Sequence, residues 1–138
     1  MRTVPAMTAD TRSTVEAFFA RVSKGDVEGA LEFIAEPVDW FTPGDTALIP
    51  WMGPRKSRSD VRAFFEMAGA HMTPESFETA HTLVDGELAV VLGSFRYRVN
   101  ATGKSFASEF ALELRVTDGK ITRYHMHEDS YAISLAFH

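Results

Sequence analysis

The spacing of apolar residues changes once along this chain, and that change limits the fold more than any other feature. In the first half, apolar residues recur at intervals of three and four, the period of an amphipathic helix, as at Val15, Phe18, Phe19 and Val22. From Glu75 onward they alternate with polar residues, the period of a strand with one buried face. The sequence therefore predicts helices first and a sheet afterwards.

Turn and cap residues place the boundaries of these elements. They predict one helix that ends at Gly25, a second over residues 26–37 and a third over residues 59–73. Val38 to Thr42 predicts a short strand, followed by an irregular loop that runs to Pro54. In the second half, about four strands are separated by three turn sequences, Asp85-Gly86, Thr102-Gly103-Lys104 and Asp118-Gly119.

A meander with one apolar face needs a cover, and the helices supply it. We therefore expect an α+β fold in which three N-terminal helices pack on one face of a curved antiparallel sheet. The length of 138 residues suits one domain spanning residues 1–138, with residues 1–9 as a flexible N-terminus.

Composition excludes several classes of function. Cysteine is absent, which removes disulfides, thiol nucleophiles and cysteine-ligated zinc. The formal net charge of -5 disfavours binding to nucleic acid or anionic membranes, and no apolar stretch approaches the ~20 residues of a membrane span. His125 and His127 share a strand face, but two ligands without a third predict no metal site. We expect a cytoplasmic protein without a cofactor.

The same alternation predicts which side chains face the helices. The inward set is mostly aromatic and aliphatic and consists of Trp40, Thr42, Phe95, Tyr97, Phe110, Leu112, Tyr124 and Met126. His81 and Glu128 fall on this face as well, and Trp51 lies in an apolar loop that we expect to fold back over it. A few hydrogen-bonding groups among aromatic walls are typical of a pocket for a small hydrophobic molecule.

Three inward residues are candidates for acid–base catalysis. Glu128, buried among Met and Tyr side chains, would have a raised pKa, and His81 belongs to the residue type most used for proton transfer near neutral pH. Tyr97 would donate a hydrogen bond to a developing oxyanion. Each has a structural alternative: Glu128 reaches solvent at the end of its strand, His81 is a hydrogen-bonded core histidine, and Tyr97, like Tyr124, is a core aromatic.

Short sequences along nearly the whole chain carry a resemblance to a known family. They are Phe18-Phe19, Lys24-Gly25-Asp26, Val38-Asp39-Trp40, Ile49-Pro50-Trp51-Met52-Gly53, Val61-Arg62-Ala63-Phe64-Phe65, Asp118-Gly119-Lys120-Ile121 and Glu128-Asp129. With these signals the chain resembles the nuclear transport factor 2-like superfamily, and within it the SnoaL-like branch related to ketosteroid isomerases. The resemblance implies a cone-shaped roll around a ligand pocket, with isomerase, cyclase or hydrolase chemistry.

The catalytic acids of two relatives are missing by the same comparison. The base and the oxyanion aspartate of ketosteroid isomerases would fall near Trp40 and Leu112, and the acids and arginine of the epoxide hydrolases at Gly93, Phe95 and Met126. A non-catalytic ligand-binding or dimerising domain is therefore the alternative. Family members commonly pair through the outer sheet face, which implies a homodimer here, and three aliphatic residues lie on that face: Leu88, Val90 and Leu92.

Overall fold

The computed structural model describes residues 4–138, and the side chains of residues 11–138. Its elements follow the chain in the order α1 (Val4–Ser23), α2 (Val27–Leu31), β1 (Ile34–Thr42), β2 (Gly53–Arg55), α3 (Arg58–His71), β3 (Met72–Asp85), β4 (Leu88–Val99), β5 (Ser105–Thr117), β6 (Lys120–Glu128) and α4 (Ser130–Leu135). The change from helical to strand spacing thus falls at Met72. The segment expected to be flexible, residues 1–9, lies outside the described side chains.

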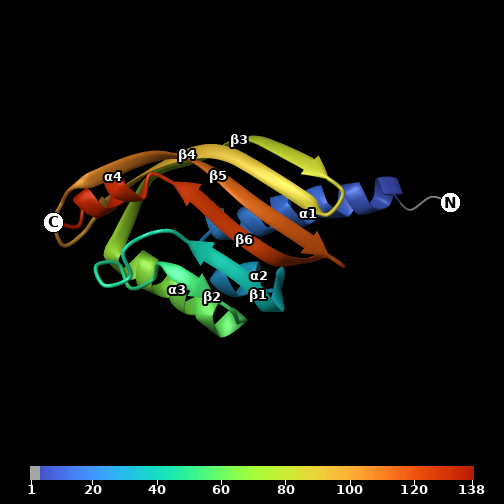
Figure 1. The fold of residues 1–138 in the computed structure, drawn as a ribbon, viewed down its shortest axis with the longest axis horizontal. Helices are drawn as coiled ribbons and strands as arrows, with labels where there is room; N and C mark the ends of the chain where they lie inside the picture. Colours follow the sequence, from blue (N-terminus) through green and yellow to red (C-terminus); the bar gives the residue numbers. More distant parts are fainter. Residues whose placement is uncertain (1–3) are drawn as a thin grey trace.

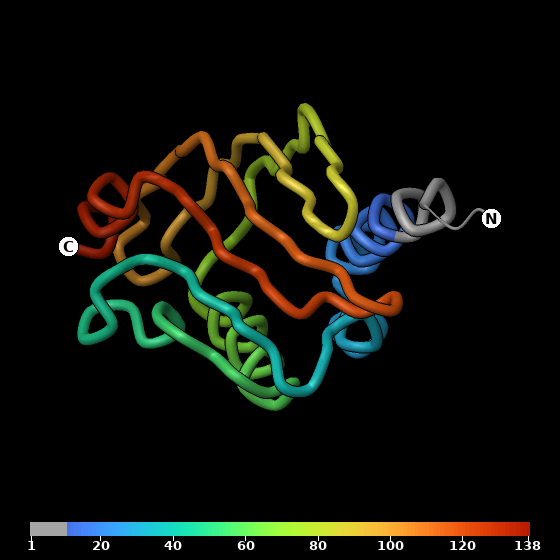
Figure 2. Tube along the Cα trace, turned by 45° about the vertical axis from the view of Figure 1, so that its right-hand side comes forward, coloured from blue at the N-terminus to red at the C-terminus, as the bar shows by residue number. Residues whose placement is uncertain are grey.

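The strands form one sheet in the order β2-β1-β6-β5-β4-β3, which curves along the length of the molecule (Figure 1). The expected antiparallel pairing holds for the other neighbouring strands, but β1 and β6 run parallel, with Trp40 opposite Tyr124. Figure 2 shows β1 lying alongside β6 although the two strands are far apart in sequence. The sheet is therefore mixed, and β1 joins the meander through its last strand.

Two substantial helices cover the sheet, not the three expected, because the helix predicted over residues 26–37 is short. Asp26 caps it as predicted, accepting a hydrogen bond from the Gly29 amide at 2.9 Å. It ends at Leu31, and the Phe33 carbonyl accepts a hydrogen bond from the Ile121 amide of β6. Pairing with β6 thus overrides the helical spacing, and Ile34 begins β1.

The loop after β1 folds back over the core, as predicted. Ile49, Trp51 and Met52 are buried there. The loop also contains a short strand that the prediction missed, because β2 pairs with the end of β1 through Gly53 and Thr42. Ser57, rather than Ser59, then caps α3, and its hydroxyl accepts a hydrogen bond from the Asp60 amide at 3.0 Å.

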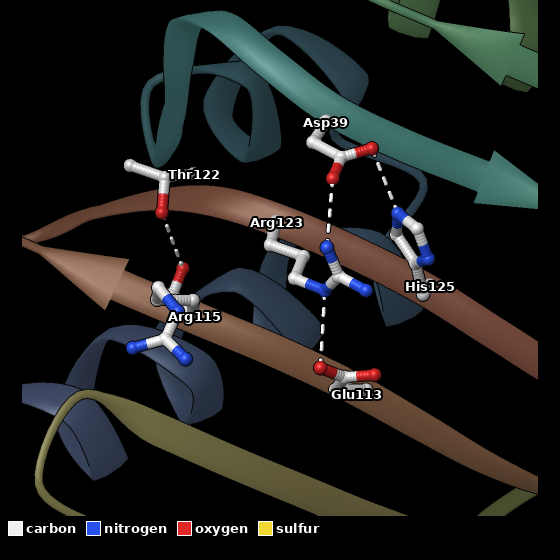
Figure 3. Close-up of polar contacts among 6 residues, drawn as sticks. All are labelled: Asp39, Glu113, Arg115, Thr122, Arg123 and His125. Atoms are coloured by element: carbon white, nitrogen blue, oxygen red, sulfur yellow. Dashed lines mark hydrogen bonds and ion pairs between the residues drawn. The ribbon is translucent and has the colours of Figure 1, made fainter.

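The two faces of the sheet differ in chemistry. The inner face is apolar, and Val38, Trp40 and Leu112 are buried on it. On the outer face Arg123 bridges strands β1 and β5, with its Nη1 2.9 Å from Asp39 Oδ2 and its Nε 3.0 Å from Glu113 Oε2 (Figure 3). His125 Nε2 lies 2.7 Å from the other Asp39 oxygen. Arg123 and His125 therefore share the outer face of β6.

No helix in the described part of the chain is long and apolar enough to cross a membrane.

Candidate ligand pocket

A cavity of about 410 Å³ lies between the helices and the inner face of the sheet. Adjacent aromatic pairs on the two long helices supply one side of it, Phe18-Phe19 from α1 and Phe64-Phe65 from α3. Helical spacing places these rings on the face of each helix that turns toward the sheet. The volume falls within the range of small-molecule pockets in proteins.

The sheet and the loop after β1 supply the other walls. The rings of Phe77 and Phe95 stack on this side, with centroids 6.4 Å apart and an angle of 8° between their planes. Phe106 and Trp51 extend the aromatic lining toward the C-terminal segment, where Ile133 of α4 closes the wall. A flat, apolar molecule would meet ring faces and edges on every side.

Among the described residues that line this cavity, Glu128 is the only carboxylic acid, and none is a lysine, arginine or histidine. It ends β6, and no basic side chain in residues 11–138 forms an ion pair with it. Burial without a compensating charge disfavours the carboxylate and raises the pKa of Glu128 to about 7. The group is therefore able to gain and lose a proton near neutral pH.

Two tyrosines line the cavity with Glu128. Burial, and then the negative charge of Glu128, raise the pKa of Tyr97 above its ordinary value. The same two causes, with a smaller contribution from Tyr97, raise the pKa of Tyr124. Both phenols therefore keep their protons at neutral pH and are able to donate hydrogen bonds into the cavity.

Thr42, at the end of β1, also lies at the cavity. The residue is 4% exposed. Its hydroxyl oxygen has no hydrogen-bond partner among the described residues, and the same is true of Nε1 of Trp40. Every other buried side-chain nitrogen or oxygen in this part of the chain has a partner.

Most residues predicted from the sequence lie at this cavity. Glu128, Tyr97, Thr42, Trp51, Phe95, Tyr124 and Met126 line it. The other three predicted ligand contacts, Trp40, Phe110 and Leu112, are buried beside it and are absent from its lining. Trp40 supports the lining from behind, since its ring contacts those of Phe64, Phe65 and Tyr124.

The prediction that His81 faces the pocket is wrong. An extra residue in β3 places Thr79 opposite Gly93 but His81 opposite the outward-facing Leu92. This bulge reverses the alternation, and His81 is exposed at a shallow hollow on the outer face. Gly93 permits the bulge, because a Cβ there would overlap the Glu78 carbonyl oxygen and the Phe110 ring.

A similar shift in β6 places Ile121, rather than its neighbour Thr122, on the inner face. The register moves by one residue between Arg115 and Val116 of β5, and Ile121 is fully buried. Tyr124 and Met126 keep their predicted inward positions beyond the shift.

The prediction omitted the helical half of the lining. Phe18, Phe19, Phe64 and Phe65 carried a signal, because they lie on the apolar faces of predicted helices. Spacing alone identifies such residues as buried and does not distinguish a ring against the sheet from a ring beside a cavity.

Comparison with known proteins places the chain in a family. The model of the SnoaL-like domain matches residues 15–124. The chain belongs to the SnoaL-like family. No curated protein sequence matches it.

Solved structures agree on the fold of this SnoaL-like chain. An NTF2-like protein from Burkholderia xenovorans LB400 has a TM-score of 0.86 at 26% identity, over 95% of this chain and 98% of that one. TerC, co-crystallised with polyporic acid, has a TM-score of 0.80 at 19% identity, over 93% and 98%. A putative SnoaL-like polyketide cyclase from Mesorhizobium loti has a TM-score of 0.68 at 18% identity, over 84% and 97%. This chain thus shares the NTF2-like fold with these proteins.

Proposed function

We propose that this protein binds a small, mostly apolar ring compound in the cavity and catalyses proton transfer on it, with Glu128 as the general acid–base. The observation that carries the proposal is the position of Glu128: a carboxyl group without an ionic partner in the described structure, in the wall of a mostly apolar cavity. Its pKa of about 7 suits a group that alternates between acid and base near neutral pH.

The tyrosines give the proposed reaction its second component. Removal of a proton next to a carbonyl group moves negative charge onto the carbonyl oxygen, and a nearby phenol stabilises that charge by donating a hydrogen bond. Tyr97 and Tyr124 both line the cavity in their protonated form. An isomerase or cyclase reaction on a ring ketone needs these two components, a base and an oxyanion donor.

Two structural neighbours support this class of ligand. One was crystallised with polyporic acid, and another is described as a putative polyketide cyclase. Because their sequence identity to this chain is low, these neighbours show a shared fold and not a shared reaction. The assignment of Glu128 therefore rests on the geometry of this pocket.

A non-catalytic ligand carrier is the second candidate. In its favour, the sequence resemblance implies that the catalytic acids of ketosteroid isomerases would fall near Trp40 and Leu112, and neither residue is an acid. A carrier and an enzyme would bind the same ligands, so only turnover separates them.

The test begins with binding and then measures turnover. Native mass spectrometry of the wild-type protein against a panel of ring ketones, phenols and quinones identifies ligands, and each ligand is then incubated with the protein and analysed for products. We expect the rate of product formation to follow a titration near pH 7. Glu128→Gln should retain binding and lose turnover by about 10²–10⁴-fold, the usual contribution of a general acid–base.

Glu109→Gln is the matched control, because Glu109 is exposed on β5 and absent from the pocket lining. Binding without turnover of any ligand would favour the carrier. Turnover that persists in Glu128→Gln would contradict the assignment of Glu128.

A further inference from the structure

Three polar groups of the cavity lack partners within the protein and yet remain accessible. Neither the carboxyl group of Glu128 nor the hydroxyls of Tyr97 and Tyr124 form a hydrogen bond in the described structure. The polar side-chain atoms that are both sealed off and without a partner there are Trp40 Nε1 and Thr42 Oγ1. A ligand in the cavity is therefore able to reach the carboxyl group and both phenol oxygens.

These three groups lie near one another. The negative charge of Glu128 raises the pKa of both phenols, and Tyr97 contributes to the shift at Tyr124. Such effects weaken with distance, so the carboxyl group and the two hydroxyls share one region of the cavity. Apart from Thr42, the other lining residues are glycines or have mainly apolar side chains.

The charge of this region is unbalanced. No lysine, arginine or histidine lines the cavity in the described part of the chain, so ionised Glu128 has no counter-charge there. A cationic ligand would supply that charge, whereas an anionic ligand would add to the imbalance. The fold has already removed Glu128 from most of its water, so pairing requires further desolvation mainly of the ligand. The net charge of -5 also favours the approach of cations over anions.

The chemistry of the walls fits an amine attached to a ring. A primary ammonium group has three N–H donors, and Glu128, Tyr97 and Tyr124 each have an oxygen that accepts a hydrogen bond. The faces of Trp51 and of the phenylalanine rings attract a cation and also pack against an aromatic ring.

We propose that the cavity binds aromatic amines as cations, with the ammonium group paired to Glu128 and the ring held among the aromatic walls. The ligand class is an aryl-alkyl primary amine, and an aryl carboxylate is excluded. This inference rests on the ligand cavity of the proposed function and is independent of its catalytic step. An amine would occupy the same site as an uncharged ring ketone and compete with it.

The test uses three naphthalenes of similar shape and different charge: 2-naphthylmethylamine, 2-naphthylmethanol and 2-naphthoate. Each is titrated by calorimetry into the wild-type protein at pH 6 and pH 8. At pH 8 we expect the amine to bind about tenfold more tightly than the alcohol, the effect of one hydrogen bond to a charged group, and the carboxylate to bind most weakly.

The pH dependence identifies the group that pairs with the amine. A carboxyl group with a pKa of about 7 is mostly ionised at pH 8 and mostly protonated at pH 6, while the amine stays charged at both values. Amine binding to the wild type should therefore weaken about tenfold between pH 8 and pH 6, and binding of the alcohol should not change. Glu128→Gln should remove both the amine preference and its pH dependence, with the affinity for the alcohol retained.

Glu109→Gln is again the control, because this exposed acid is absent from the pocket lining, and it should bind all three probes as the wild type does. Equal wild-type affinity for amine and alcohol, or an amine preference that survives in Glu128→Gln, would overturn this inference and leave the pocket proposal standing. Amine binding without turnover of any ligand would count against the catalytic proposal alone. Failure of every probe to bind the wild type would overturn both.

Discussion

The indole ring of Trp40 lies flat against the phenol ring of Tyr124, with ring centroids 3.6 Å apart and an angle of 3° between their planes. Tyr124 lines the cavity, while Trp40 is fully buried behind it. Phe64 and Phe65 meet the indole edge-on from α3. Trp40 thus joins the helix to the sheet and fixes the plane of a ring that the ligand would contact.

Trp40→Leu should therefore damage both stability and binding. Removal of this ring leaves a cavity at the junction of α3, β1 and β6, and the loss of a large buried aromatic costs about 3–5 kcal/mol in the free energy of unfolding. Urea denaturation measures this loss, and calorimetry should show weaker binding of 2-naphthol. Phe41→Leu is the control, because Phe41 is the next residue of β1 and is 37% exposed on the other face. A similar loss in both variants would contradict the role given to Trp40.

Glu128 makes the stability of the protein depend on pH in a direction opposite to most carboxylates. Burial raises its pKa from 4.5 to about 7, so the folded state binds a proton more tightly than the unfolded state. The resulting stability is present below pH 4.5 and is lost as the pH rises through about 7. Above that pH the folded protein holds an uncompensated charge.

Glu128→Gln should remove this dependence. At pH 8 we expect the variant to be more stable than the wild type by about 1–3 kcal/mol, because the neutral amide carries no buried charge, and at pH 4 the two should be equal within error. Thermal unfolding across this range measures the difference. Glu109→Gln, on the exposed face of β5, should follow the wild type throughout. A stability difference between wild type and Glu128→Gln that is the same at both pH values would contradict the burial of this charge.

Gly93→Ala should disturb the bulge that turns His81 outward. The added Cβ would overlap the Glu78 carbonyl oxygen and lie 2.7 Å from the Phe110 ring. We expect a loss of about 1–3 kcal/mol in stability, typical of overpacking. Gly69→Ala is the control, because a Cβ there meets nothing within 4 Å, and alanine should stabilise α3 by about 0.5–1 kcal/mol. Chemical denaturation of the two variants measures both effects. A Gly93→Ala variant as stable as the wild type would contradict the close approach of β3 to Gly93.

The outer face of the sheet is the proposed dimer interface. Leu83, Leu92 and Phe41 are 58%, 36% and 37% exposed, and the sheet pairing places Leu83 and Leu92 on one face. Light scattering should give twice the chain mass of 15.3 kDa. Leu92→Lys should shift the protein to the monomer, while Leu135→Lys, on the 50% exposed Leu135 of α4, should leave the dimer intact. A wild-type mass equal to that of one chain would contradict this proposal.

The sequence predicted the elements that depend on local chemistry. Asp26 and the glycine turns placed their boundaries correctly, and strict alternation identified the inward faces of β5 and of the second half of β4. The errors arose where one distant contact decided the outcome. Ile34 has helical spacing with the residues before it, yet a hydrogen bond between Phe33 and Ile121 assigns it to a strand.

The same limit applies to the pocket. Glu128, Tyr97 and Thr42 were predicted correctly as lining residues because inward and outward side chains alternate without interruption in the part of each strand that holds them. His81 was misplaced because one additional residue in β3 changes the parity of the count, and nothing in the residues around Ala80 marks that position. Gly93 was the available signal, on the neighbouring strand.

The parallel pairing of β1 with β6 also bears on the order in which the parts of the fold assemble. Ile34 pairs with Ile121, so β1 meets its long neighbour only after nearly the whole intervening chain is in place, and until then its partner is the three-residue β2. Contacts between such distant segments form slowly, because a long loop must close first. We therefore expect the wall that contains Thr42, Trp40 and Tyr124 to form late in folding, and a chain that stops short of β6 would lack that wall.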